Sequence, residues 1–66
     1  MMLLEISEAY AESAARLKER MQELRAWEKA EENPEEARRI RRRIEILAVI
    51  WRETRAVAAL TAHYYD

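Results

Sequence analysis

The densest group of chemically active side chains is a run of arginines at residues 38 to 43, within the sequence ARRIRRR. Guanidinium groups donate paired hydrogen bonds to phosphate oxygens, and a basic helix can follow a nucleic-acid backbone. At about 100° per residue, however, adjacent arginines surround a helix and do not form one stripe. The residues that would form a nucleic-acid or anion site are Arg38, Arg39, Arg41, Arg42 and Arg43.

Acidic residues offer these arginines a different role, in ion pairs. Glu35 lies four residues before Arg39, and Arg41 lies four residues before Glu45, which is the spacing of neighbours on a helix surface. Acids late in the preceding segment would reach the same region if the chain folds back on itself. These are Glu23, Glu28, Glu31 and Glu32. Solvated, paired charge is therefore the favoured interpretation of the arginine run, and anion binding is the alternative.

Other side chains give no support to catalysis or metal binding. His63 is the only histidine, Ala59 and Leu60 occupy the positions one turn before it, and the chain has no cysteine. Its serines and threonines lack the His and Asp partners that activate a nucleophile. A glycine-rich phosphate loop is excluded because the chain has no glycine. We expect no enzyme activity, no cofactor and no metal site.

Composition indicates one small folded domain. The chain has 66 residues, of which 50% are hydrophobic and 38% charged, with a formal net charge of −1. The hydrophobic fraction is too high for a disordered chain. The net charge is too close to zero for a protein built mainly to coat nucleic acid. The longest apolar run, ILAVIW, is far shorter than the roughly 18 residues needed to span a bilayer. We expect a cytoplasmic protein without membrane association.

Turn signals are confined to the segment AEENPEEA, residues 30–37. Pro34 disfavours helical dihedrals at Asn33, and asparagine is among the best residues for capping a helix N-terminus. Proline is favoured at the first helical position, because its missing N–H would have no partner there. Glu36 stands where it could complete a capping box. This pattern predicts that a helix begins at residue 34.

Helical periodicity extends over both sides of this turn. The spacing predicts helices at about residues 3–31 and 34–64, with a turn at about 32–33, in a single domain spanning 1–66. Because the connection is so short, the helices must be antiparallel, so the expected fold is an all-α two-helix hairpin with coiled-coil spacing. The first apolar face is Leu3, Ile6, Tyr10, Ala14, Leu17, Met21, Leu24 and Trp27. The second is Ala37, Ile40, Ile44, Leu47, Trp51, Thr54, Ala58, Thr61 and Tyr65.

The second helix carries more apolar residues than one partner helix can cover. A helix that is apolar around much of its circumference is normally buried on several sides. An exposed patch of this size is unusual for a monomer, and a two-fold dimer is the commonest way to cover one. We therefore predict that two hairpins form a four-helix bundle. The predicted oligomer interface consists of Ile46, Val49, Ile50, Val57, Leu60 and Tyr64.

Two resemblances accompany this architecture. Two long helices, a tight turn and two-fold pairing resemble the Rop-like RNA-binding hairpins of plasmids, in layout alone. The segments NPEEARRIRRRIEIL and WRETRAVAALTAHYY are similar to small uncharacterised bacterial helical-hairpin proteins associated with mobile elements. The first resemblance implies RNA binding, and the second implies a fold without a specific activity. We expect a small homo-oligomeric helical-bundle protein acting in protein–protein interaction, as an accessory or regulatory factor. The alternative is RNA or DNA binding through the arginines at 38–43.

Overall fold

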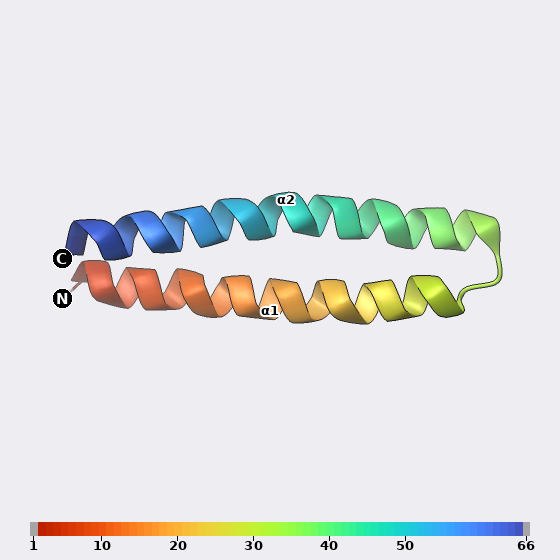
Figure 1. Ribbon diagram of the computed structural model, residues 1–66, viewed down its shortest axis with the longest axis horizontal. Coiled ribbons are helices and arrows are strands. Elements are labelled where there is room, and N and C mark those ends of the chain that lie inside the picture. The colour runs from red at the N-terminus through yellow and green to blue at the C-terminus, as the bar shows by residue number, and fades with distance from the viewer. Residues whose placement is uncertain (1, 66) are drawn as a thin grey trace.

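The computed structural model shows two long helices that run antiparallel and are joined by a short turn (Figure 1). It describes residues 2–65, with the backbone alone described at residue 65. Helix α1 spans Met2–Ala30 and helix α2 spans Pro34–Tyr65. The Cα atoms extend over 49 × 14 × 12 Å, and both chain ends lie at the same end of the molecule. The expected all-α hairpin is confirmed.

Hydrogen bonds around Asn33 fix the turn. The Glu35 N–H donates to the Asn33 side-chain oxygen at 3.0 Å, which is the N-cap interaction expected from the Asn-Pro pair. The Asn33 N–H donates to the Glu31 carboxylate at 3.2 Å. The predicted capping box is therefore wrong, because the Asn33 N–H donates to Glu31 and not to the expected acceptor, Glu36. Glu36 instead pairs with Arg39.

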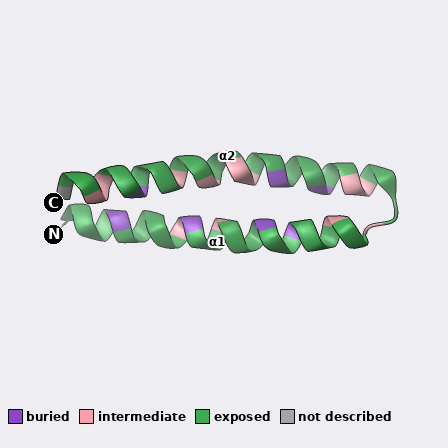
Figure 2. Cartoon of the chain, in the orientation of Figure 1, coloured by how far each residue is buried: buried purple, intermediate pink, exposed green. Residues whose placement is uncertain are grey.

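Helix α2 buries the face that its periodicity predicted. Ile40, Ile44 and Ala58 are buried. The remaining described members of this face are half-buried, and they are Ala37, Leu47, Trp51, Thr54 and Thr61. The predicted member Tyr65 has a side chain outside the described part of the chain. In Figure 2 the buried and half-buried segments of both helices lie mainly along their facing sides.

Helix α1 packs through a face that is partly different from the predicted one. Ala14, Met21 and Leu24 are buried and Leu17 is half-buried, as expected. The other four predicted members are exposed, and they are Leu3, Ile6, Tyr10 and Trp27. The contact line from Leu24 through Ala14 continues at the 3.5-residue spacing of packed helices to Ser7, and in the other direction to the half-buried Glu28.

Two polar interactions across the hairpin account for this shift. The buried Ser7 hydroxyl donates to the Ala58 carbonyl oxygen at 2.9 Å, so its burial leaves no unpaired donor. At the other end, Arg41 donates to the Glu28 carboxylate at 2.7 Å. Because these polar side chains have partners on the other helix, they can occupy the contact line. The large apolar residues beside them are then left on the surface.

The hydrophobic core is concentrated in the half of the hairpin near the turn. Leu24 is 1% exposed and packs with Ile40 and Ile44, and the half-buried Leu47 covers the same cluster. Towards the chain ends the buried apolar residues are the small Ala14 and Ala58. The radius of gyration is 15.0 Å, whereas a compact domain of this length would have about 11 Å. The hairpin therefore encloses little of its apolar surface.

Candidate interaction surface

Exposed residues, most of them apolar, form a stripe along α2, beside the face that contacts α1. All six residues predicted at an oligomer interface are exposed. Five of them belong to a series spaced alternately by four and three residues, which we call the α2 stripe. It consists of Arg39, Arg43, Ile46, Ile50, Glu53, Val57, Leu60 and Tyr64. The sixth, Val49, lies about 100° around the helix from Ile50, on the outer side of α2.

Helix α1 contributes a matching stripe, which the sequence placed inside the hairpin. The exposed residues Leu3, Ile6, Tyr10 and Trp27 belong to a series with the same alternating spacing. We call this series the α1 stripe. It consists of Leu3, Ile6, Tyr10, Ser13, Leu17, Arg20, Leu24 and Trp27. Of these, Leu24 is buried and Ser13 and Leu17 are half-buried, so the exposed apolar members lie towards the two ends of the helix. Both helices therefore expose large apolar side chains, whereas the surplus was expected on the second helix alone.

Three shallow hollows join the two stripes on the same side of the molecule. The first, of about 450 Å³, is lined by Tyr10 and Leu17 of α1 and by Ile50 of α2. It shares Arg20 with the second, of about 310 Å³, which lies between Leu24, Arg43 and Ile46. The second shares Arg43 with the third, of about 380 Å³, which is lined by Trp27 and Arg39. The hollows form one groove, and we call the surface made by both stripes the apolar face.

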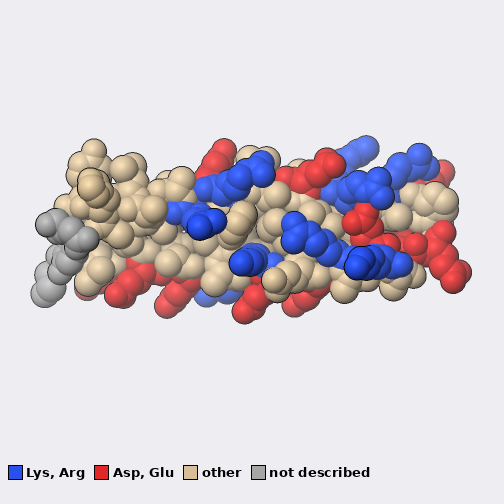
Figure 3. Space-filling model, in the orientation of Figure 1, with Lys and Arg blue, Asp and Glu red and all other residues tan. Residues whose placement is uncertain are grey.

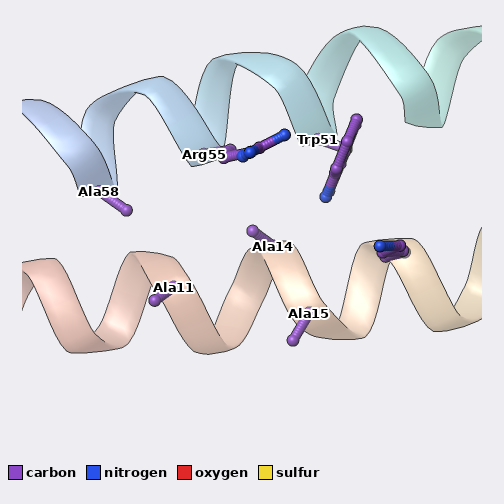
Figure 4. Close-up of a pocket in the computed structure, with 7 residues that line it drawn as sticks. Ala11, Ala14, Ala15, Trp51, Arg55 and Ala58 are labelled. Carbon is purple, nitrogen blue, oxygen red and sulfur yellow. The ribbon is translucent and has the colours of Figure 1, made fainter.

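The opposite side of the hairpin has a different character. A hollow of about 380 Å³ is lined there by small and basic residues around Trp51 (Figure 4). The Arg55 guanidinium lies 5.4 Å from the centre of the Trp51 ring, in a cation–π contact. Across from them, Ala14 points from α1 towards α2 (Figure 4). A small residue therefore lies opposite Trp51 at this level, and the alanine leaves the indole half-buried.

The total exposed area of the hairpin is larger than that of a typical folded monomer of the same mass. The chain has a mass of 7.9 kDa, and a folded monomer of that mass exposes about 4,400 Å². The hairpin exposes 5420 Å². The excess, about 1,000 Å², is comparable with the roughly 800 Å² that each partner buries in a stable protein–protein interface.

The arginines at 38–43 are only partly engaged in ion pairs. Arg41 pairs across the hairpin with Glu28, as the acidic end of the first helix suggested. The two pairs expected within the second helix, Glu35 with Arg39 and Arg41 with Glu45, are replaced by others. Arg39 contacts Glu36 at 2.9 Å, and Arg41 contacts Glu28. The structure shows no ion pair for Arg38, Arg42 or Arg43 within residues 2–65. These side chains surround α2, so the five arginines do not share one surface.

A basic residue of α1 joins the cluster on the apolar face, and sequence reasoning did not select it. Arg20 lines the same hollow as Arg43, although the two are far apart in the chain. The sequence pattern could have indicated Arg20, since it lies between Leu17 and Leu24 in the three-and-four spacing of the apolar residues. Arg20 also contacts Glu23 at 3.0 Å, with both side chains exposed. Such a pair contributes at most about 1 kcal/mol and leaves the guanidinium accessible.

Other candidate chemistry is sparse in the described residues. His63 is exposed and lies edge-on to Tyr64, with ring centres 5.9 Å apart. Within residues 2–65, no group of three acidic or histidine side chains is placed to hold a metal ion. Neither described helix has a stretch long and apolar enough to cross a membrane.

Charge is distributed unevenly along the hairpin. In Figure 3 basic and acidic side chains cover much of the surface near the turn, whereas towards the chain termini the visible charged side chains are mainly acidic and lie along the lower edge of the view. Residues 56–62 of α2 carry no charged side chain. No family model, curated protein or solved structure matches this chain. The apolar face itself is therefore the basis for assigning a function.

Proposed function

We propose that this protein acts through protein–protein interaction as a small homo-oligomeric helical bundle, in which two hairpins cover each other's apolar faces. The role that fits such a chain is that of an accessory or regulatory factor. The observation that supports the proposal is the continuity of the apolar face. Large exposed apolar side chains repeat at three-and-four spacing on both helices, which is the pattern of a helix surface that packs against other helices.

The energetics of the isolated hairpin also favour association. A domain of this size rarely encloses enough core to be stable alone, and the chain has no cysteine for a disulfide. Among the described residues, the buried ones in the half of the hairpin near the chain ends are serine and alanine. Burying an exposed Ile, Leu or Val contributes up to about 1.5–3 kcal/mol for a complete side chain, so a second hairpin adds what the first lacks.

Thermal unfolding at several protein concentrations tests this proposal. If folding is coupled to association, the melting temperature measured by circular dichroism rises with concentration. We expect such a rise over the micromolar range. A cooperative melt whose midpoint is independent of concentration would show that the hairpin folds as a monomer and would contradict the proposal.

Nucleic-acid binding is the second candidate function, because Arg38, Arg42 and Arg43 form no ion pair within the described chain. A dimer would present this cluster twice. Binding of this kind weakens steeply with salt, with a slope set by the number of phosphates neutralised. Electrophoretic retardation of mixed RNA and DNA fragments at low salt tests it. Loss of retardation when the three arginines are replaced by alanine would support this candidate, and absence of retardation by the unaltered chain would exclude it.

A further inference from the structure

We propose that the second hairpin lies antiparallel to the first on the apolar face, so that Glu53 of each copy pairs with Arg43 of the other. This inference rests on the self-association proposed above and adds the orientation of the partner. Glu53 is the only acidic residue in the α2 stripe, and neither Glu53 nor Arg43 forms an ion pair within residues 2–65. Both side chains therefore remain available to a second copy.

The length of the hairpin places these two residues opposite each other. At a rise of about 1.5 Å per residue, Arg43 lies about 16 Å from the turn and Glu53 about 31 Å. A two-fold axis that reverses the hairpin direction places α2 on α2 of the second copy. With the ends aligned over the 49 Å length, a residue about 16 Å from one turn faces a residue about 33 Å from the other. That level is about 2 Å, or between one and two residues' rise, from Glu53.

Apolar residues match under the same alignment. Ile46 and Ile50 lie about 20 and 26 Å from the turn. Near the centre of the interface, Ile46 of one copy therefore faces Ile50 of the second copy, and Ile50 faces Ile46. On α1, Trp27 lies about 8 Å from the turn and Ile6 about 40 Å, which brings the half-exposed indole opposite an exposed isoleucine. The antiparallel alignment thus covers Trp27, which is 52% exposed in the hairpin.

The opposite orientation brings like charges together. If the turns lay at the same end, the two-fold axis would run along the hairpin and place α1 on α2 of the second copy. Residues at equal distances from the turn would then face each other. Arg20, about 19 Å from the turn, would face Arg43 at about 16 Å, and the symmetry would repeat this contact. Opposed like charges are destabilising at an interface, whereas the antiparallel pair opposes Arg43 with Glu53.

Charge reversals distinguish the two orientations by the sign of their effect. Sedimentation equilibrium of the full chain measures the dimer dissociation constant for the unaltered protein and for Glu53→Arg, Arg43→Glu and the double variant. In the antiparallel pair each single reversal opposes like charges at two symmetric sites, so we expect the Kd to rise about tenfold. The double variant restores opposite charges and should recover most of that loss. Arg52→Glu, beside Glu53 in sequence but outside the α2 stripe, is the matched control and should leave the Kd unchanged.

A tighter dimer for Arg43→Glu would overturn the inference, because in the parallel pair this change relieves repulsion from Arg20. A double variant as weak as the single ones would overturn it too. Failure of the proposed function is a separate result, since the unaltered chain would then sediment as a monomer.

Engineered cysteines give a second measurement that does not depend on charge. The chain has no native cysteine, so Ile6→Cys and Trp27→Cys each introduce a single thiol. In the antiparallel pair, oxidising a mixture of the two variants should form a disulfide-linked heterodimer, and neither variant alone should cross-link. No heterodimer from a mixture that sediments as a dimer would contradict the antiparallel orientation.

Discussion

Replacing Ile50 by lysine should separate the two hairpins, because Ile50 lies at the centre of the α2 stripe. Complete burial of an isoleucine contributes about 1.5–3 kcal/mol. The side chain is 42% exposed in the hairpin, so a second copy can still bury area worth about 1 kcal/mol. Two symmetric copies lose about 2 kcal/mol together, which corresponds to a Kd raised about 30-fold.

Val49→Lys provides the matched control for this substitution. Val49 is 45% exposed and adjacent to Ile50, but it lies on the outer side of α2. We expect its dimer Kd to change by less than about threefold, because the residue makes no contact in the proposed bundle. Analytical ultracentrifugation of both variants, with helix content followed by circular dichroism, measures the difference. If the two substitutions raised the dimer Kd equally, the apolar face would not be the dimer interface.

Four further substitutions test the packing, the turn and the ion pair across the hairpin. Ile44→Ala should cost about 3 kcal/mol of unfolding free energy in chemical denaturation, because Ile44 is buried in the main cluster. Trp51→Ala should cost less, about 2 kcal/mol, because the indole is half-buried over alanine; a larger cost than for Ile44→Ala would contradict the observed packing. Asn33→Ala should cost about 1 kcal/mol by removing the N-cap bond, and an unchanged melting temperature would show that the cap is dispensable. Arg41→Ala should cost about 1 kcal/mol, since the Arg41 side of its pair with the half-buried Glu28 is exposed to solvent, and the cost should shrink at high salt.

The second helix could be predicted from sequence more completely than the first. Its contact face follows an unbroken three-and-four spacing from Ala37 to Thr61, and every described member is buried or half-buried. The Asn33-Pro34 pair likewise identified the start of α2, because the preference of proline and the capping side chain act locally. Local signals of this kind do not depend on the rest of the fold.

The first helix was harder to predict because its contact face includes polar residues. Apolar spacing favoured Ile6 over Ser7 and Trp27 over Glu28. The structure reverses both choices, since Ser7 bonds to the Ala58 carbonyl, 51 positions along the chain, and Glu28 pairs with Arg41. A hydrogen bond to a residue so far along the chain cannot be predicted from the local spacing of apolar residues. The consequence for the interaction surface is substantial, because the displaced apolar residues become its α1 stripe.

The arginine run shows the same limit. Its paired, solvated role could be anticipated from the acids at the end of α1, and the contact between Arg41 and Glu28 agrees with it. The position of Arg20 beside Arg43 depends on how far α2 is rotated about its axis, and composition does not encode that rotation. The groove that joins both helices is a property of the folded hairpin.

The mass of the unaltered chain in solution tests the central claim most directly. The apolar face and the excess of exposed area predict that sedimentation equilibrium at micromolar concentration gives twice the chain mass of 7.9 kDa. Dilution should convert this species into a monomer that has lost helix content, because a single hairpin encloses too little core. A mass of 7.9 kDa throughout the micromolar range, with helix content unchanged on dilution, would contradict the account.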